Sequence, residues 1–173
     1  MKRRDAIKTL LMASGGVLAL PSWAMNWKRQ DIPDYDSSFN ELELRLISSI
    51  ADTIIPSNGE IGALSVGVDK FLAGLISKCY EEDFRDDIKK CLHQLQSSAN
   101  SMHNLSFFDC EQADRESIFL AMNNDINENE EAFFSFMKSQ TIRGFETSEE
   151  VLVNYHNYQL MPGFYDGNVD VEI

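Results

Sequence analysis

Apolar residues recur every three or four positions along most of the chain after residue 38, which is the spacing of the buried face of an α-helix. This pattern predicts five helices, near residues 38–55, 68–79, 82–100, 109–122 and 129–143. Strict alternation of apolar and polar residues, which is typical of strands, is limited to short stretches such as 169–173. We therefore expect an all-α fold, an irregular bundle of about five helices followed by an irregular aromatic C-terminal tail.

Residues that favour helix ends stand at several of the predicted boundaries. Ser38 is expected to cap the first helix, with Glu41 three residues later completing a capping box, and Pro56 ends it. Asp109 is the expected N-cap of the fourth helix. Gly144 is expected just beyond the fifth helix, as a C′ glycine in the left-handed conformation.

The first 24 residues have the layout of an export signal. A basic head over residues 2–8 precedes a modestly apolar run over residues 9–20, and the segment 21–24 ends in small residues three apart, as signal peptidase requires. The run is shorter than the roughly 20 residues that span a bilayer. We expect a signal peptide over residues 1–24, cleaved after Ala24, then an extended lead-in over 25–38 and one helical domain with its tail over 39–173.

The basic head resembles the twin-arginine signal, whose usual form is Arg-Arg-x-Phe-Leu-Lys. Arg3, Arg4 and Lys8 match this form, Ile7 is an acceptable apolar residue, and Ala6 departs from the usual aromatic. The resemblance implies export of an already folded protein through the twin-arginine translocase, and therefore a periplasmic location. The alternative is an ordinary signal for unfolded chains that carries two arginines.

The charge of the chain limits the partners it can bind. Its formal net charge is −13, and removal of residues 1–24, which hold four basic residues and one acidic residue, leaves −16. Such a charge repels nucleic acid and anionic lipid surfaces, whereas a basic or weakly charged protein partner is easier to accommodate. The roughly 150 residues that remain are enough for one compact domain.

Cysteine and histidine residues suggest no metal or haem site. Three cysteines, Cys79, Cys91 and Cys110, leave at least one unpaired in an oxidising compartment. Cys79 and Cys91 either join two successive helices through a disulfide or lie as buried free thiols on apolar helical stripes. No histidine and cysteine show the close spacing of zinc ligands, and Cys-x-x-Cys-His is absent from the sequence.

The sequence also lacks the common motifs of catalysis and cofactor binding. No serine or cysteine stands in a Gly-x-Ser-x-Gly elbow, and the glycines at 59, 62 and 67 lack the spacing of a dinucleotide loop. We therefore expect no catalytic, cofactor-binding or metal-binding residue in this chain. A signal for folded export on a chain without a cofactor motif is a mismatch, and this mismatch is the main functional clue in the sequence.

Four segments together resemble the small subunit of membrane-bound gluconate 2-dehydrogenase, often called subunit 3. They are Ile50–Pro56; Gly62–Leu64 with Gly67–Phe71; Thr141–Glu149, similar to the family's Thr-x-x-Gly-Tyr-x-Thr-Ser-Glu; and Pro162–Gly167. Their order and spacing agree with the family, as does the twin-arginine start. Asn168 stands where many members of the family have cysteine.

The resemblance implies a non-catalytic partner of a flavin-dependent dehydrogenase of the glucose–methanol–choline type. In such complexes FAD and the catalytic residues belong to the large subunit, and a multihaem cytochrome c is often the third subunit. A small subunit with a twin-arginine signal would stabilise the large subunit and escort it during export. It would be held at the inner membrane through a partner. The alternatives are a free-standing periplasmic binding or chaperone-like module without a redox partner, and an enzyme in its own right.

We hypothesise that residues of the third and fourth segments and of the tail contact the partner. Aromatic side chains outside regular helices are typical of interface anchors. The hypothesised partner-binding residues are Gly144, Phe145, Thr147, Tyr158, Pro162, Gly163, Phe164, Tyr165 and Gly167. Purely structural roles are the alternative for Asp52, Gly62 and Gly144.

Overall fold

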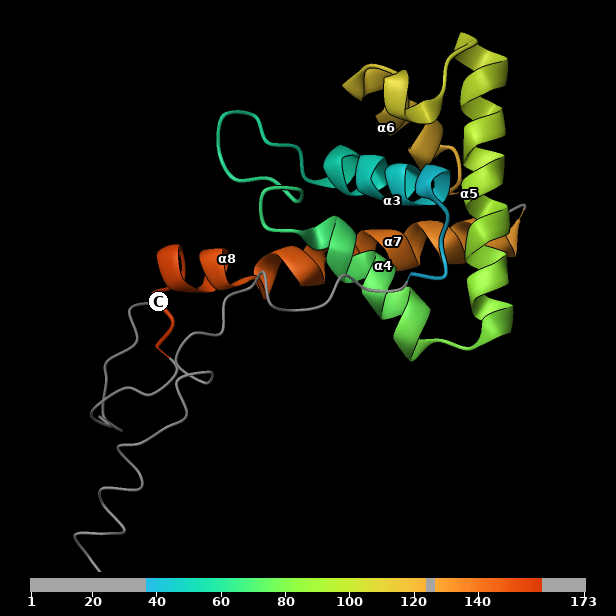
Figure 1. Ribbon diagram of the computed structural model, residues 1–173. Coiled ribbons are helices and arrows are strands. Elements are labelled where there is room, and N and C mark those ends of the chain that lie inside the picture. The colour runs from blue at the N-terminus through green and yellow to red at the C-terminus, as the bar shows by residue number, and fades with distance from the viewer. Residues whose placement is uncertain (1–36, 124–126, 160–173) are drawn as a thin grey trace, which may run out of the picture. The chain divides into compact units, whose positions relative to one another are not determined.

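A computed structural model describes residues 37–123 and 127–159 (Figure 1). The helices are α3 (Glu41–Ile54), α4 (Val68–Cys79), α5 (Glu82–His103), α6 (Gln112–Leu120), α7 (Glu128–Glu146) and α8 (Glu149–Asn154), with a 3-10 turn η2 (Phe107–Asp109) before α6. The described residues contain no strand, so the predicted all-α fold is confirmed. The five longer helices correspond to those predicted, whereas the short α8 was not predicted. The signal residues Arg3, Arg4, Lys8 and Ala24 lie outside the described residues.

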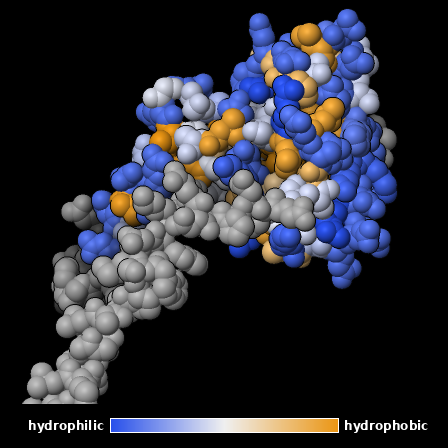
Figure 2. Space-filling view, in the orientation of Figure 1, coloured by the Kyte–Doolittle hydropathy of each residue, from blue (hydrophilic) through white to orange (hydrophobic). Residues whose placement is uncertain are grey.

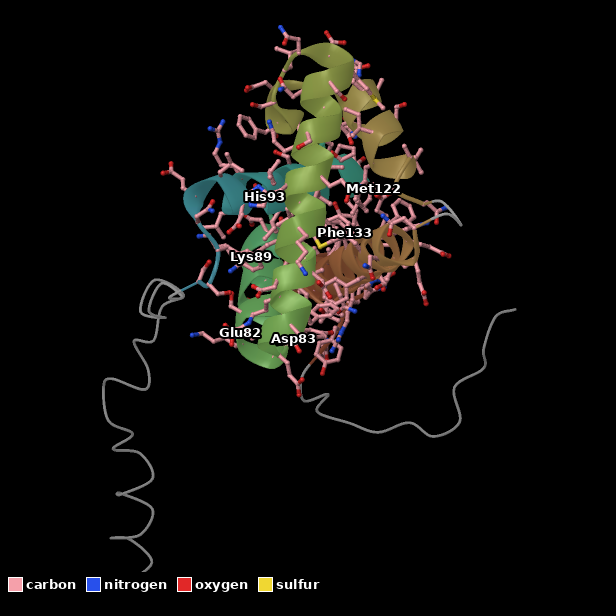
Figure 3. The ribbon with its side chains drawn as sticks, turned by 90° about the vertical axis from the view of Figure 1, so that its right-hand side faces the viewer. Glu82, Asp83, Lys89, His93, Met122 and Phe133 are labelled. Carbon is pink, nitrogen blue, oxygen red and sulfur yellow. The ribbon has the colours of Figure 1, made fainter. Side chains whose placement is uncertain are left out.

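Three helices, α3, α4 and α7, pack against one another in the centre of the bundle. The helix α5 packs across α3 and α7 at the end opposite the loop between α3 and α4, and η2 and α6 cover α3 (Figure 1). Figure 3 shows α5 in front, with α3 and α4 on one side and α7 on the other. No helix in the described ranges has both the length and the apolar character needed to cross a bilayer.

The core consists of the apolar positions that define the helical spacing in the sequence. The largest side chains that are fully shielded from solvent are Leu46, Ile47 and Ile50 of α3, Leu72 and Ile76 of α4, Leu92 and Leu95 of α5, Phe107 of η2 and Met137 of α7. Burial of one such side chain contributes about 1.5–3 kcal/mol. The hydrophobic effect on these stripes therefore determines how the helices pack.

The first helix begins two residues later than predicted. Asn40 is its N-cap: the Glu43 N–H donates to Asn40 Oδ1 (2.9 Å) and the Asn40 N–H donates to Glu43 Oε2 (2.8 Å). Ser38 instead contacts α4, because its N–H donates to Ser77 Oγ (3.2 Å) and the two hydroxyl oxygens are 3.1 Å apart. With the cap at Asn40, Phe39 enters the core just before the helix begins. The predicted capping box of Ser38 and Glu41 was wrong.

The fourth helix also begins later than predicted, since Asp109 ends η2 and Glu111 is the N-cap of α6. The Phe107 N–H donates to the side-chain oxygen of Gln96 on α5 (3.0 Å), and the Phe107 ring is fully buried. Burial of the Phe107 ring therefore stabilises η2 as a separate turn, and α6 begins only after it. The predicted cap at Asp109 was wrong.

The capping box gives the first testable prediction. Asn40→Ala should lower the free energy of unfolding by about 1 kcal/mol, because the Glu43 N–H loses its acceptor. Thermal or urea unfolding would measure the change. The matched control is Asn100→Ala on the exposed surface of α5, where alanine favours the helix and the change should stay within about 0.5 kcal/mol. Equal effects of the two substitutions would contradict a specific cap at Asn40.

Candidate functional site

Three of the four segments singled out in the sequence meet at one end of the central helices. Residues 50–56 end α3 and begin its loop, residues 62–71 complete this loop and begin α4, and residues 141–149 end α7 and begin α8. Direct contacts between these segments, described below, hold them together. We call residues 50–56, 62–71 and 141–149 the motif cluster. The fourth segment, with Pro162, Gly163, Phe164, Tyr165 and Gly167, lies outside the described residues.

The loop between α3 and α4 is fixed by hydrogen bonds within the motif cluster. The Ala63 N–H donates to the Ile55 carbonyl (2.9 Å), and the Val68 N–H donates to the Ala63 carbonyl (3.0 Å). The Gly62 N–H donates to Ser65 Oγ (2.9 Å), and this hydroxyl donates to the Gly62 carbonyl (2.7 Å). The loop therefore joins α3 to α4 in one defined geometry.

Gly62 lies directly against the backbone at the beginning of this loop. A Cβ atom at this position would be 2.6 Å from the Ser57 nitrogen and 2.9 Å from the Pro56 carbonyl carbon. Backbone atoms cannot move aside as a flexible side chain can, so only glycine fits. This finding gives Gly62 a structural role.

Gly144 lies inside α7, which continues to Glu146, and it does not adopt the left-handed conformation. The prediction of a C′ glycine was therefore wrong. A Cβ atom on Gly144 would be 2.7 Å from Cδ1 of Phe71 and 3.4 Å from Cγ1 of Val68, both on α4. The missing side chain is what lets α7 approach α4 this closely.

Asp52 ties the end of α3 to α6 through a polar network. Arg115 Nη2 donates to Asp52 Oδ2 (2.8 Å) and to Gln112 Oε1 (2.7 Å). Gln112 Nε2 in turn donates to the Thr53 carbonyl (3.0 Å) and to Glu116 Oε1 (2.9 Å). The side chains of Arg115 and Asp52 are only 14% and 25% exposed, so this pair is shielded from solvent far more than a surface pair.

The remaining described residues of the partner hypothesis differ in exposure. Gly144 is buried, and Phe145 is partly buried and packs against the core. Thr147 is exposed at the end of α7, and its hydroxyl donates to the Arg143 carbonyl (2.7 Å). Tyr158 is 50% exposed. Among the described residues of the hypothesis, Thr147 and Tyr158 are therefore the ones that a partner protein could reach.

A short helix that sequence analysis missed, α8, follows the motif cluster, and exposed apolar side chains lie in it and just after it. Ser148 caps α8 by accepting the Val151 N–H on its hydroxyl (3.4 Å), and Glu149 and Glu150 occupy the first turn. Val153 in α8 and Tyr155 and Tyr158 just after it are 50%, 58% and 50% exposed. On the face seen in Figure 2, α8 shows a small hydrophobic area within hydrophilic surroundings.

The three cysteines are free thiols. Burial raises the pKa of Cys91 and of Cys110, so both stay protonated and weakly reactive at neutral pH. Cys79 is exposed at the end of α4, contrary to the expectation of a buried thiol there. In residues 37–123 and 127–159, no group of three or more histidine, cysteine, aspartate or glutamate side chains is placed to hold a metal ion.

Comparison with known proteins identifies a family. The model described as Gluconate 2-dehydrogenase subunit 3 matches residues 41–163, from the first residue of α3 to beyond the last described residue. The match covers well over half of the chain and confirms the resemblance found in the sequence. No curated protein and no solved structure matches the chain.

The two glycines of the motif cluster should differ in their tolerance of a methyl group. Gly62→Ala should lower the free energy of unfolding by about 3 kcal/mol, since the new Cβ meets backbone. Gly144→Ala should cost about 1 kcal/mol, because the gain in helix propensity offsets part of the clash with Phe71. In a Phe71→Ala background, Gly144→Ala should become stabilising. Urea unfolding of Gly62→Ala, Gly144→Ala, Phe71→Ala and the double variant of Gly144→Ala with Phe71→Ala would measure these free energies. If Gly144→Ala still lowers the free energy of unfolding in the Phe71→Ala background, the packing role is refuted.

The pair of Asp52 and Arg115 provides a second test of the motif cluster. Asp52→Ala should lower the free energy of unfolding by about 2 kcal/mol, because it leaves a largely buried guanidinium without its carboxylate. The double variant with Arg115→Ala should cost less than the sum of the single variants, with a coupling of about 1 kcal/mol. Asp87→Ala is the control, since its pair with Lys90 is exposed and should be worth no more than about 0.5 kcal/mol. Additive effects of Asp52→Ala and Arg115→Ala would contradict the coupling.

Proposed function

We propose that this chain, which belongs to the gluconate 2-dehydrogenase subunit 3 family, is the non-catalytic small subunit of a flavin-dependent dehydrogenase complex. The observation that carries the proposal is the family match over residues 41–163, which spans every described helix. In the complex, a large subunit of the glucose–methanol–choline type holds FAD and the catalytic residues, and a cytochrome c subunit accepts the electrons. The small subunit stabilises the large subunit by binding to it.

The second part of the proposal is that the small subunit escorts its partner during export. The basic head with Arg3, Arg4 and Lys8 is the sequence feature that supports this role. FAD is inserted in the cytoplasm, so the large subunit must cross the membrane folded. A large subunit without a signal of its own would then reach the periplasm only while bound to this chain.

The negative net charge of the chain supports a protein partner. Without residues 1–24 the formal net charge of the chain is −16, which disfavours nucleic acid and anionic lipid and favours a protein surface with basic groups. The rival role, a free-standing periplasmic binding or chaperone-like module, would require no flavoprotein at all. Isolation of the chain from cells therefore separates the two roles directly.

The proposal predicts a shared location for the chain and a flavoprotein. The tagged chain purified from periplasm should retain a large subunit with the absorbance of bound FAD. The double substitution Arg3→Lys and Arg4→Lys should leave both proteins in the cytoplasm, because the twin-arginine translocase no longer accepts the signal. Cell fractionation with immunoblotting and a flavin spectrum of the eluate would measure both results.

Arg29→Lys is the matched control for this experiment, since it makes the same chemical change beyond the expected cleavage site after Ala24. It should leave the distribution of both proteins unchanged. A large subunit that still reaches the periplasm with the double lysine variant would refute the escort role. A periplasmic chain that retains no flavoprotein would refute the proposed complex.

A further inference from the structure

We infer that Asn58, at the tip of the loop between α3 and α4, is a site of spontaneous covalent modification, where the side-chain amide is lost and aspartate and isoaspartate replace asparagine. Asn58 and Gly59 form the one Asn-Gly pair in the sequence. The reaction needs only this chain and water, so it does not depend on the proposed dehydrogenase complex.

The modification is an intramolecular substitution followed by hydrolysis. Hydroxide removes the proton from the Gly59 backbone nitrogen, and this nitrogen attacks Cγ of Asn58. A bond forms between the two atoms, and the bond from Cγ to the amide nitrogen breaks. The amide nitrogen takes a proton from water and leaves as ammonia, so that a cyclic succinimide remains.

Water then opens the succinimide in one of two ways. Cleavage of the bond between the Gly59 nitrogen and Cγ gives aspartate at position 58. Cleavage of the bond between this nitrogen and the backbone carbonyl carbon gives isoaspartate, in which the chain continues through the side chain of residue 58. Either product adds one negative charge to the loop, and isoaspartate also adds one carbon atom to its backbone.

Both reacting groups are free to meet in the folded chain. Across residues 37–123 and 127–159, no group accepts a hydrogen bond from the Gly59 N–H, and the Asn58 side chain forms no hydrogen bond. Gly59 has φ 89°, and a Cβ atom built there would have no atom within 4 Å. Glycine leaves the approach to its own nitrogen open and tolerates a wide range of φ and ψ. The attack needs only a rotation that brings this nitrogen close to Cγ.

The loop can make this rotation without disturbing the motif cluster. Residues 57–60 are exposed, and the loop extends beyond the ends of α3 and α4 (Figure 1). Its base is held by the Ala63 N–H, which donates to the Ile55 carbonyl (2.9 Å). At the tip, the Asn58 N–H donates to the Pro56 carbonyl (3.2 Å), a bond on the far side of Asn58 from the reacting nitrogen. Modification therefore changes the tip of the loop and leaves its base in place.

Other asparagines of the chain lack one or more of these features. Asn40 Oδ1 accepts the Glu43 N–H, so its side chain is held as a helix cap. Asn100 is followed by the small residue Ser101, but both lie inside α5, where helical hydrogen bonds fix the backbone. Asn104 is exposed beyond the end of α5, but the side chain of the next residue, a leucine, crowds the attacking nitrogen.

The experiment follows the amides of the purified chain during incubation in warm, mildly alkaline buffer. Peptide mapping by mass spectrometry measures the conversion of each amide to an acid, and electron-transfer fragmentation separates isoaspartate from aspartate. Asn58 should react about tenfold faster than Asn100 and Asn104, because a free backbone and an uncrowded nitrogen lower the barrier to ring closure. Both acidic products should form at position 58.

Two variants test the chemistry of the attack. Asn58→Gln should suppress the reaction at this position, because the longer side chain must close a larger and less favourable ring. Gly59→Ala should slow it about tenfold, because alanine crowds the nitrogen and disfavours the positive φ. Thermal melts should show that both variants fold, since residues 58 and 59 are exposed.

The same mapping in guanidinium chloride tests the contribution of the fold. On unfolding, the rate at Asn58 should change less than about threefold, whereas Asn100 should react faster once its helix is lost. If Asn58 in the folded chain reacts no faster than Asn100, or reacts more than about tenfold slower than in the unfolded chain, the loop protects it and the inference is wrong. Formation of aspartate without isoaspartate would show direct hydrolysis and would overturn the cyclic route.

Discussion

The arrangement of this chain depends on how closely α7 can approach α4. Gly144 provides this approach, because any larger residue would bring a Cβ atom against the Phe71 ring. Gly62 provides the corresponding close contact in the loop that joins α3 to α4. The contact of Gly144 fixes the position of the last turns of α7 against α4, and α8 begins three residues after α7 ends, so the position of the exposed tyrosines depends on a buried glycine.

The spacing of apolar residues was sufficient to predict the five longer helices, because a helix that buries one face needs an apolar residue every three or four positions. Helix ends were predicted less well. Ser38 and Asn40 each precede a glutamate by three residues, and tertiary contacts distinguish them: Ser38 bonds to Ser77 on α4, and Phe39 enters the core. Glycine is favoured both just beyond a helix end and where two helices pack closely, so the sequence alone could not show which role Gly144 has. The residue that it packs against, Phe71, is distant in sequence.

The sequence predicted which segments form the candidate site, but it did not predict how these segments are arranged in space. The segments around Asp52, Gly62 and Gly144 were singled out, yet their meeting in one cluster depends on tertiary packing that spacing alone does not encode. Asp52 interacts with Arg115, which no sequence feature had marked. The helix α8 was missed because six residues are too few for helical periodicity to emerge, although Ser148 followed by two glutamates is a typical helix start.

The burial of Cys91 and Cys110 has a consequence for the order of events on the proposed route of folded export. A chain that emerged unfolded would expose all its thiols to the oxidising machinery of the periplasm, where incorrect disulfides form and require isomerisation. A chain that emerges folded exposes only Cys79 in its described part, and this thiol has no accessible intramolecular partner there. Folding before oxidation would thus protect the protein from mispaired disulfides and make it independent of a disulfide isomerase.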